Sequence, residues 1–398
     1  MSRFWDNMME IAVIGENEDG SVSRLGGITP EYERGVAVAR QQMEAAGLQT
    51  EVDPVHNLVG TLPGSDPNAK AILIGSHLDT VTCGGKFDGV LGVSGGIEVA
   101  NRLKEEGRSL RHPLQVWGFN LEEASLVGGT FGSRSVVGFV DMTAPGFEDR
   151  LAHYGWTTRT IQDCRRDLSR WACYLEYHIE QGDKLDNEKI DIGVVNGIVS
   201  VIRYDVTAKG MSNHAGTTMM ANRKDALVGM SKLIVKSAEL AREIDDTLVF
   251  TVGKQSVQPG QENVIPCQVD ATFEMRHMDK AKTDELFHRI QECAAEIPDC
   301  EFSFVNTTAK YSTPCDPKLI QLIDRVCEEA GVSHTIMPSG AGHDANAIAH
   351  EGVPIGMIFV PSAGGKSHCG DEWTDPRLCD LGADILYRCV LALDEELD

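Results

Sequence analysis

Acid and imidazole side chains that could bind metal ions recur along this chain in short segments. The segments cover residues 75–79, 86–89, 120–123, 177–182 and 366–368. Five of their side chains could hold two transition-metal ions around one shared carboxylate, and a sixth could act as a base. That combination is typical of metal-assisted hydrolysis. Each segment alone is a weak signal, and the ordered set is a strong one.

The first two segments place an aspartate beside a histidine or a glycine. A metal-bound imidazole needs an acceptor for its second N–H, and the carboxylate of Asp79 could supply it to His77. The alternative is a solvated loop histidine beside a capping aspartate. Asp88 stands before Gly89 in a glycine-rich segment, where a carboxylate could bridge two metals. The alternative there is an ordinary Asp-Gly turn.

The other segments carry two adjacent glutamates and two separate histidines. In extended or loop backbone the side chains of Glu122 and Glu123 diverge, so one could bind metal while the other faces the reactive water. Such a pair is otherwise an acidic helix N-terminus. His178 and His368 could each be a core histidine or a ligand. The joint presence of all these groups favours the metal site.

Three continuous apolar runs end just before reactive residues. Residues 71–74, 114–119 and 355–360 predict buried strands of an α/β sheet. Residues 31–47 predict a helix from their apolar spacing. Open α/β sheets place their sites at the carboxyl ends of such strands. We therefore expect one sheet edge to gather the acids and imidazoles.

The middle of the chain has a different pattern. It predicts strands at 200–208, 247–252, 269–275 and 301–305, and helices at 223–243 and 280–297. The order β-α-β-β-α-β is the ferredoxin-like arrangement. We expect an α/β fold: a catalytic, metal-binding domain with a central mixed sheet and helices on both faces, interrupted by a smaller α+β domain. The expected divisions are 1–195 and 313–398 for the catalytic domain and 196–312 for the insertion.

The composition restricts the partners and the compartment. The 398-residue chain is 42% hydrophobic and has a formal net charge of −24. Such a charge repels nucleic acid and anionic membranes, so neither is an expected partner, and an acidic substrate needs a local cationic pocket. The N-terminal residues lack the pattern of a signal peptide, and no run approaches the roughly 20 apolar residues of a membrane span. With 11 cysteines in no disulfide-scaffold spacing, we expect a reduced, cytoplasmic protein.

Motifs spread over nearly the whole chain resemble those of the M20 family of dinuclear metallohydrolases. They lie at residues 75–81, 84–89, 178–182, 213–218, 223–227, 263–266, 340–345 and 367–374. His-Ile-Glu-Gln-Gly at 178–182 and Asn-His-Ala-Gly-Thr-Thr at 213–218 are similar to the amidase, hydantoinase and carbamoylase branch rather than to the peptidase branch. That branch includes N-carbamoyl-L-amino acid hydrolases, β-ureidopropionases and allantoate amidohydrolases.

The resemblance implies a role for each residue of the site. The metal ligands would be His77, Asp88, Glu123, His178 and His368, with Asp88 bridging two divalent ions per subunit. Glu122 would be the general base and acid, and Asp79 would orient His77. Mixed imidazole and carboxylate ligands suit zinc, and also manganese, cobalt or nickel. A metal-bridging hydroxide would attack the amide or ureido carbon.

The resemblance also implies the substrate contacts and the assembly. His214 would reach the site of the partner subunit and polarise the scissile carbonyl, in a homodimer formed through the inserted lid and dimerisation domain. Asn263 and Arg276 would hold the carboxylate of a small-molecule substrate, because the guanidinium fork suits that group. Gln181 and His343 would face the substrate.

The implied activity is hydrolysis of the C–N amide bond of a ureido or N-carbamoyl acid. Two alternatives stay open. One is hydrolysis of N-acyl amino acids or related amides at the same site, and the other is a catalytically silent ligand-binding protein, which would lack the base or a ligand. The chain departs from the branch at Leu126, where an arginine is usual. Cys83 and Cys369 lie next to ligand motifs and could be soft ligands, reactive thiols or packing residues.

Overall fold

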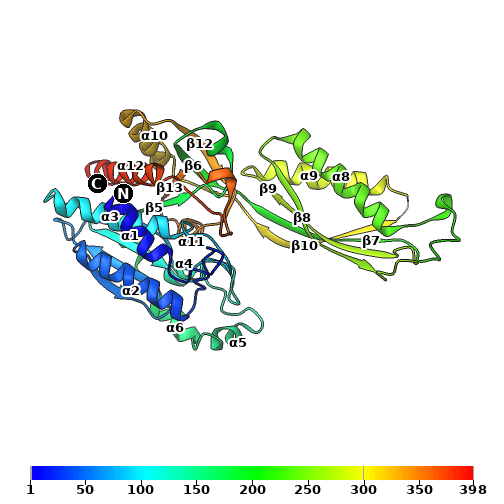
Figure 1. The fold of residues 1–398 in the computed structure, drawn as a ribbon, viewed down its shortest axis with the longest axis horizontal. Coiled ribbons are helices and arrows are strands. Elements are labelled where there is room, and N and C mark those ends of the chain that lie inside the picture. The colour runs from blue at the N-terminus through cyan, green and yellow to red at the C-terminus, as the bar shows by residue number, and fades with distance from the viewer. Residues whose placement is uncertain (1, 299, 398) are drawn as a thin grey trace. The chain divides into compact units, whose positions relative to one another are not determined.

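The computed structural model describes residues 2–298 and 300–397. The chain forms two compact units, which divide between Asn196 and Gly197 and again between Thr313 and Pro314 (Figure 1). We call the discontinuous one the large unit and the other the inserted unit. These divisions lie beside those predicted after residues 195 and 312.

The large unit contains a mixed sheet. Its strands are β1 (Gln49–Val52), β2 (Leu58–Leu62), β3 (Ala71–His77), β4 (Leu114–Phe119), β5 (Trp171–Ile179), β6 (Ile192–Ile198), β11 (Thr313–Pro314), β12 (His334–Ser339) and β13 (Ile355–Val360). The order across the sheet is β1-β2-β4-β3-β5-β13-β6-β11, and β12 pairs with β6. The central strands β4, β3, β5 and β13 are parallel, and β2 and β6 join them antiparallel.

Burial explains why the apolar runs form central strands. Every residue of β3 and β13 is buried, as expected for parallel strands covered on both faces. The strands predicted at 114–119 and 355–360 are confirmed as β4 and β13. The strand predicted at 71–74 continues to His77, so the histidine lies on the sheet itself.

Helices cover both faces of this sheet, as predicted. They are α1 (Arg3–Ala12), α2 (Pro30–Ala45), α3 (Val90–Glu105), α4 (Phe131–Val137), α5 (Phe147–Ala152), α6 (Thr158–Cys164), α7 (Lys184–Glu188), α10 (Pro317–Ala330), α11 (Asp344–His350) and α12 (Pro376–Glu396), with short 3-10 turns at Leu168–Arg170 and Ala363–Gly365. Leu175 and Tyr177 of β5 pack in one core with α3 and α12. Glu176, on the opposite face, accepts a hydrogen bond from the backbone N–H of Ala345 in α11. The helix predicted at 31–47 is α2.

The inserted unit has the predicted ferredoxin-like order. Its elements are β7 (Val201–Lys209), a 3-10 turn (Met220–Asn222), α8 (Ala226–Ile244), β8 (Val249–Gln258), β9 (Gln268–Arg276), α9 (Lys280–Ala295) and β10 (Glu301–Lys310). The antiparallel sheet has the order β10-β7-β9-β8. Helix α8 begins later than predicted because Asp225 caps it, accepting from the backbone N–H groups of Leu227 and Val228. Strands β8 and β10 run further than predicted because their ends are largely exposed and carry no apolar signal.

Candidate metal and catalytic site

Adjacent parallel strands bring the predicted acids and imidazoles together. His77 ends β3 and pairs in register with Phe119, which ends β4 just before Glu122 and Glu123. His178 lies near the end of β5. Because the carboxyl ends of parallel strands meet at one sheet edge, residues far apart in the sequence become neighbours there.

Asp88 lies between two sets of side chains. Its Oδ1 is 3.2 Å from His77 Nε2 and 3.0 Å from His178 Nε2. Its Oδ2 is 3.0 Å from His368 Nε2, and that nitrogen is 3.3 Å from Glu123 Oε1. These side chains form two groups with metal-ligand spacing, and each group includes one Asp88 oxygen. One group is His77, Asp88 and His178, and the other is Asp88, Glu123 and His368. This is the arrangement that a carboxylate bridging two ions requires.

The hydrogen bonds of two histidines leave lone pairs facing Asp88. His77 Nδ1 is 2.9 Å from the carbonyl oxygen of Asp79, and His178 Nδ1 is 2.9 Å from that of Ile179. A carbonyl only accepts, so both Nδ1 atoms carry a hydrogen, and each Nε2 can give its lone pair to a metal once no proton occupies it. The buried Asp88 Oδ1 that they face accepts no hydrogen bond. Acceptors directed at one another favour a cation between them, so these residues fit a metal centre.

The charge balance of the site also favours cations. Hydrogen bonds to Asp88 and Glu123 raise the pKa of His368 to about 10. Burial lowers the pKa of His77, but Asp88 and Glu122 raise it by more, so that it lies well above its usual value. Protons and divalent cations therefore compete for this site.

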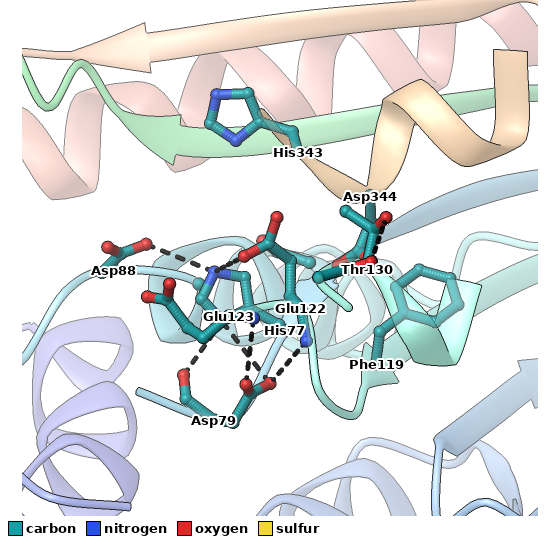
Figure 2. A network of polar contacts seen from close by, with 12 residues as sticks. His77, Asp79, Asp88, Phe119, Glu122, Glu123, Thr130, His343 and Asp344 are labelled. Carbon is teal, nitrogen blue, oxygen red and sulfur yellow. Dashed lines mark hydrogen bonds and ion pairs between the residues drawn. The ribbon is translucent and has the colours of Figure 1, made fainter. Parts of the chain in front are cut away.

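Asp79 orients its neighbours differently from the prediction. The main-chain carbonyl of Asp79, and not its carboxylate, accepts from His77, whose Nδ1 is 3.8 Å from Asp79 Oδ1. The carboxylate instead accepts from the backbone N–H groups of Glu122 and Glu123, each at 3.2 Å (Figure 2). The reason is that β3 ends at His77 and the chain bends at Leu78, which brings the Asp79 carbonyl within hydrogen-bonding distance of the ring nitrogen. Asp79 thus fixes both the histidine and the glutamate pair.

The two adjacent glutamates point to different partners. Glu123 faces His368, whereas Glu122 Oε2 lies 3.9 Å from His77 Nε2. Burial, with the negative charges of Asp344 and Glu123, raises the pKa of Glu122 well above its usual value, against the effect of His77. A carboxyl group with a raised pKa can take and return a proton near neutral pH.

Glycine is required next to the shared aspartate. Gly89 has φ +68°, and a Cβ there would lie 2.5 Å from His77 Nδ1. Its backbone N–H donates to His178 Nε2 at 3.2 Å, which places the main chain directly against the site. The Asp-Gly turn considered above as an alternative is therefore present together with the ligand geometry.

Glu372 is a positioning residue that the sequence reasoning missed. It is buried, and its Oε1 accepts from the backbone N–H groups of Phe87 at 2.8 Å and Asp88 at 3.2 Å. Its Oε2 accepts from the hydroxyl of Ser367 at 2.8 Å. Glu372 thereby ties the loop of Asp88 to the loop that carries His368. Its position in a motif was the only sequence signal, and spacing alone gave it no partner.

Two residues predicted to face the substrate have other partners in the large unit. Gln181 donates from Nε2 to Asp88 Oδ2 at 2.9 Å. His343 is 2% exposed, lies 2.8 Å from the Ser339 hydroxyl through Nε2, and packs its ring 4.7 Å from that of His178. It is the N-cap residue of helix α11. The His343 ring therefore contacts the ring of the predicted ligand His178.

The inserted unit separates its three predicted site residues. The loops of His214 and Asn263 are paired, because the backbone N–H of Ala215 donates to the carbonyl of Asn263 at 2.9 Å. His214 follows β7 and Asn263 precedes β9, so both lie at one end of the sheet. Arg276 is the last residue of β9, at the other end. The nine residues of β9 from Gln268 to Arg276, which are eight steps along the strand, span about 27 Å. Arg276 donates from Nε to Glu274 at 2.7 Å. Asn263 and Arg276 of one chain thus cannot hold the same carboxylate.

The remaining sequence signals lie at the margin of the site. Leu126 is 52% exposed. Cys83 is exposed and Cys369 is half-buried. Among the described residues, no group with metal-ligand spacing includes a cysteine. Within the same residues, no helix is long and apolar enough to span a membrane.

The site and fold have close counterparts among known proteins. Residues 73–392 match the model of peptidase family M20/M25/M40. The chain is 33% identical to the N-carbamoyl-L-amino acid amidohydrolase of Geobacillus stearothermophilus, with 98% of each chain covered. It is 32% identical to the allantoate amidohydrolase of Escherichia coli (strain K12), with 92% of this chain and 91% of the relative covered.

A solved structure extends the likeness to the whole fold. The amidase of the hydantoinase/carbamoylase family from Burkholderia multivorans superposes with a TM-score of 0.88 at 31% identity, covering 98% of this chain and 97% of its own. With the family model matching most of the chain, the protein belongs to peptidase family M20/M25/M40 and is a hydrolase related to the hydantoinase/carbamoylase amidases.

Proposed function

We propose that this protein is a metal-dependent amidohydrolase that cleaves the C–N amide bond of a ureido or N-carbamoyl acid. The single observation that carries the proposal is Asp88, whose two oxygens face two separate sets of ligands. Relatives named for N-carbamoyl-L-amino acids and for allantoate support the ureido class. The ligands would be His77, Asp88, Glu123, His178 and His368, and zinc, manganese, cobalt or nickel would suit them.

The residues of the large unit account for the proton transfers. When bound, two divalent ions would activate water and polarise the scissile carbonyl. Glu122 would accept a proton from the attacking water and return it to the leaving nitrogen, as its raised pKa allows. Asp79 would hold Glu122 and His77 in place through its main chain and carboxylate. For a ureido substrate, the carbamate released would decompose to carbon dioxide and ammonia.

The inserted unit would bind the polar ends of the substrate in a homodimer. We propose that His214 and Asn263 act in the site of the partner subunit and that Arg276 binds the substrate carboxylate as a planar fork. Arg276 lies at the opposite end of the sheet from His214 and Asn263, which supports this division of roles between them. The cysteine spacing is not that of a disulfide scaffold, which supports our proposal of a cytoplasmic location.

Release of ammonia tests the proposed reaction. Purified, metal-loaded protein would be offered N-carbamoyl-α-amino acids, β-ureidopropionate, allantoate, and N-acetyl and N-formyl amino acids, with ammonia and amine assayed together. We expect ammonia and amine from a ureido acid, lost after chelation and restored by a divalent metal. Amine without ammonia, from an acylated substrate, would replace the proposal with the acyl-hydrolase alternative.

A further inference from the structure

A pocket that the proposed mechanism does not use opens beside the metal ligands. It has a volume of about 540 Å³ and lies wholly in the large unit. Glu123 and Asp79 form part of its wall, so the pocket is continuous with the site. Its volume lies within the range of small-molecule sites, far above that of a packing defect.

The exposed part of the wall is apolar. Leu25, Ile28 and Leu126 line the pocket and are 41%, 50% and 52% exposed. Exposed apolar side chains gathered around one concavity mark a binding surface rather than ordinary scatter. No lysine or arginine is among the lining residues, and the acidic side chains there are Asp79 and Glu123. The basic side chain in the lining is that of His153, so the pocket offers an anion two carboxylates and no permanently charged cation.

Hydrogen bonds hold the wall of the pocket to the segment that follows β4. Asn120 accepts from the backbone N–H of Gly27 at 2.8 Å and donates to the Gly27 carbonyl at 2.9 Å. Tyr154, which also lines the pocket, stacks on Trp156 with ring centroids 5.0 Å apart. The pocket is thus preformed, and its position is set by the same segment that carries Glu122 and Glu123.

We infer that this pocket receives the side chain of an N-carbamoyl amino acid and selects bulky, uncharged, apolar side chains. The inference rests on the proposed function and names its substrate class. An apolar side chain would cover Leu25, Ile28 and Leu126, whereas a side-chain carboxylate would meet Asp79 and Glu123 with no lysine or arginine to pair with. Each methylene of fit in such a pocket changes kcat/KM by about tenfold or more.

A series of N-carbamoyl amino acids, one of which has a charged side chain, tests the inference. We expect kcat/KM for the N-carbamoyl derivatives of leucine, methionine and phenylalanine to exceed that of N-carbamoylglycine by about tenfold or more, with N-carbamoylaspartate the poorest. Leu126→Arg should lower the values for the apolar substrates and raise that for N-carbamoylaspartate. Leu126→Ala should reduce the apolar preference without helping the aspartate derivative.

A matched control distinguishes the effect of a charge in the pocket from the effect of a charge elsewhere on the surface. Ile336→Arg adds the same charge to a 48% exposed residue of β12 that does not line the pocket, and should leave the substrate ranking unchanged. Ammonia release with no apolar preference, and no change in ranking with Leu126→Arg, would overturn the inference while the proposed function stands. If no ureido acid released ammonia, the proposed function and the inference would fall together.

Discussion

Two neighbouring glutamates have different surroundings, and a matched pair of substitutions separates their roles. Glu123 faces His368 and Asp88, whereas Glu122 is directed toward His77 with a raised pKa. We expect Glu122→Gln to lower kcat by about 10²–10⁴-fold, because a positioned general base contributes that much. Its metal content should stay that of the wild type.

The neighbouring substitution provides the control. Glu123→Gln removes a predicted ligand, so it should lower the metal content measured by elemental analysis. Full turnover in Glu122→Gln, or equal metal loss in both variants, would contradict the assignment of base and ligand to these two positions.

A buried acid behind the site makes stability depend on pH. Burial and the negative charge of Glu176 raise the pKa of Asp344 well above the usual range of an aspartate. Above that value the unfolded chain has lost a proton that the native chain keeps, so the free energy of unfolding falls as pH rises toward the native pKa. Asp344→Asn removes this titration and still accepts from Ser133, which donates to Asp344 Oδ1.

The comparison is made by chemical denaturation between about pH 5 and 7. We expect Asp344→Asn to gain stability relative to the wild type as pH rises, by up to about 1.4 kcal/mol per pH unit. Asp141→Asn, at an exposed position whose pKa Thr143 lowers, should show a difference that is flat over this range. A flat difference for Asp344→Asn as well would show that Asp344 ionises normally in the native state.

At the scale of elements, two loops must be held together for the ligands to meet. Glu372 joins the loop of Asp88 to that of His368 through Phe87, Asp88 and Ser367. Groups that orient metal ligands typically affect affinity by about 10–100-fold. We expect Glu372→Ala to weaken metal binding by that factor in a chelator competition, with the ligands themselves unchanged.

The conservative variant distinguishes positioning from general destabilisation. Glu372→Gln keeps an acceptor for the backbone N–H groups and should recover most of the affinity. If Glu372→Ala bound metal as tightly as the wild type, the loop contact would have no role in forming the site. If both variants lost affinity equally, the charge of Glu372, and not its hydrogen bonds, would be responsible.

At the scale of the whole molecule, the opposite placement of His214 and Arg276 on one sheet predicts shared active sites. If His214 serves the partner subunit, a chain with Glu122→Gln and a chain with His214→Ala complement each other in a mixed dimer. One of the two sites in that dimer then has an intact Glu122 and an intact His214. With random pairing of equal amounts, about a quarter of all sites are restored, since a twofold dimer has two equivalent sites.

Activity after co-expression of the two tagged variants measures this. The control is a mixture of the Glu122→Gln and Asp79→Asn chains, whose changes both lie in the large unit. It should regain no activity beyond that of either variant, because each site draws these residues from one chain. Absence of complementation between the Glu122→Gln and His214→Ala chains would show that His214 acts within its own subunit or not at all.

The sequence by itself determined much of the fold and the composition of the site. The apolar run at 355–360 predicted the bounds of β13, because a strand buried on both faces needs apolar residues throughout, and β4 has the same pattern apart from the partly buried Gln115. The order of elements predicted the ferredoxin-like sheet, because apolar residues recur with different periods in amphipathic helices and strands. The predicted ligand set rests on residue types and on the family resemblance, and it stays a prediction.

Only the tertiary structure decided how these residues meet. The carbonyl of Asp79 faces His77 because the chain turns there, and residue type does not encode the direction of a main-chain carbonyl. Glu372 contacts Asp88 across a separation of 284 residues, so local spacing held no sign of the contact. His343 is buried behind His178 because helix α11 packs against β5. Long-range contacts fix such partners, and a one-dimensional pattern does not contain them.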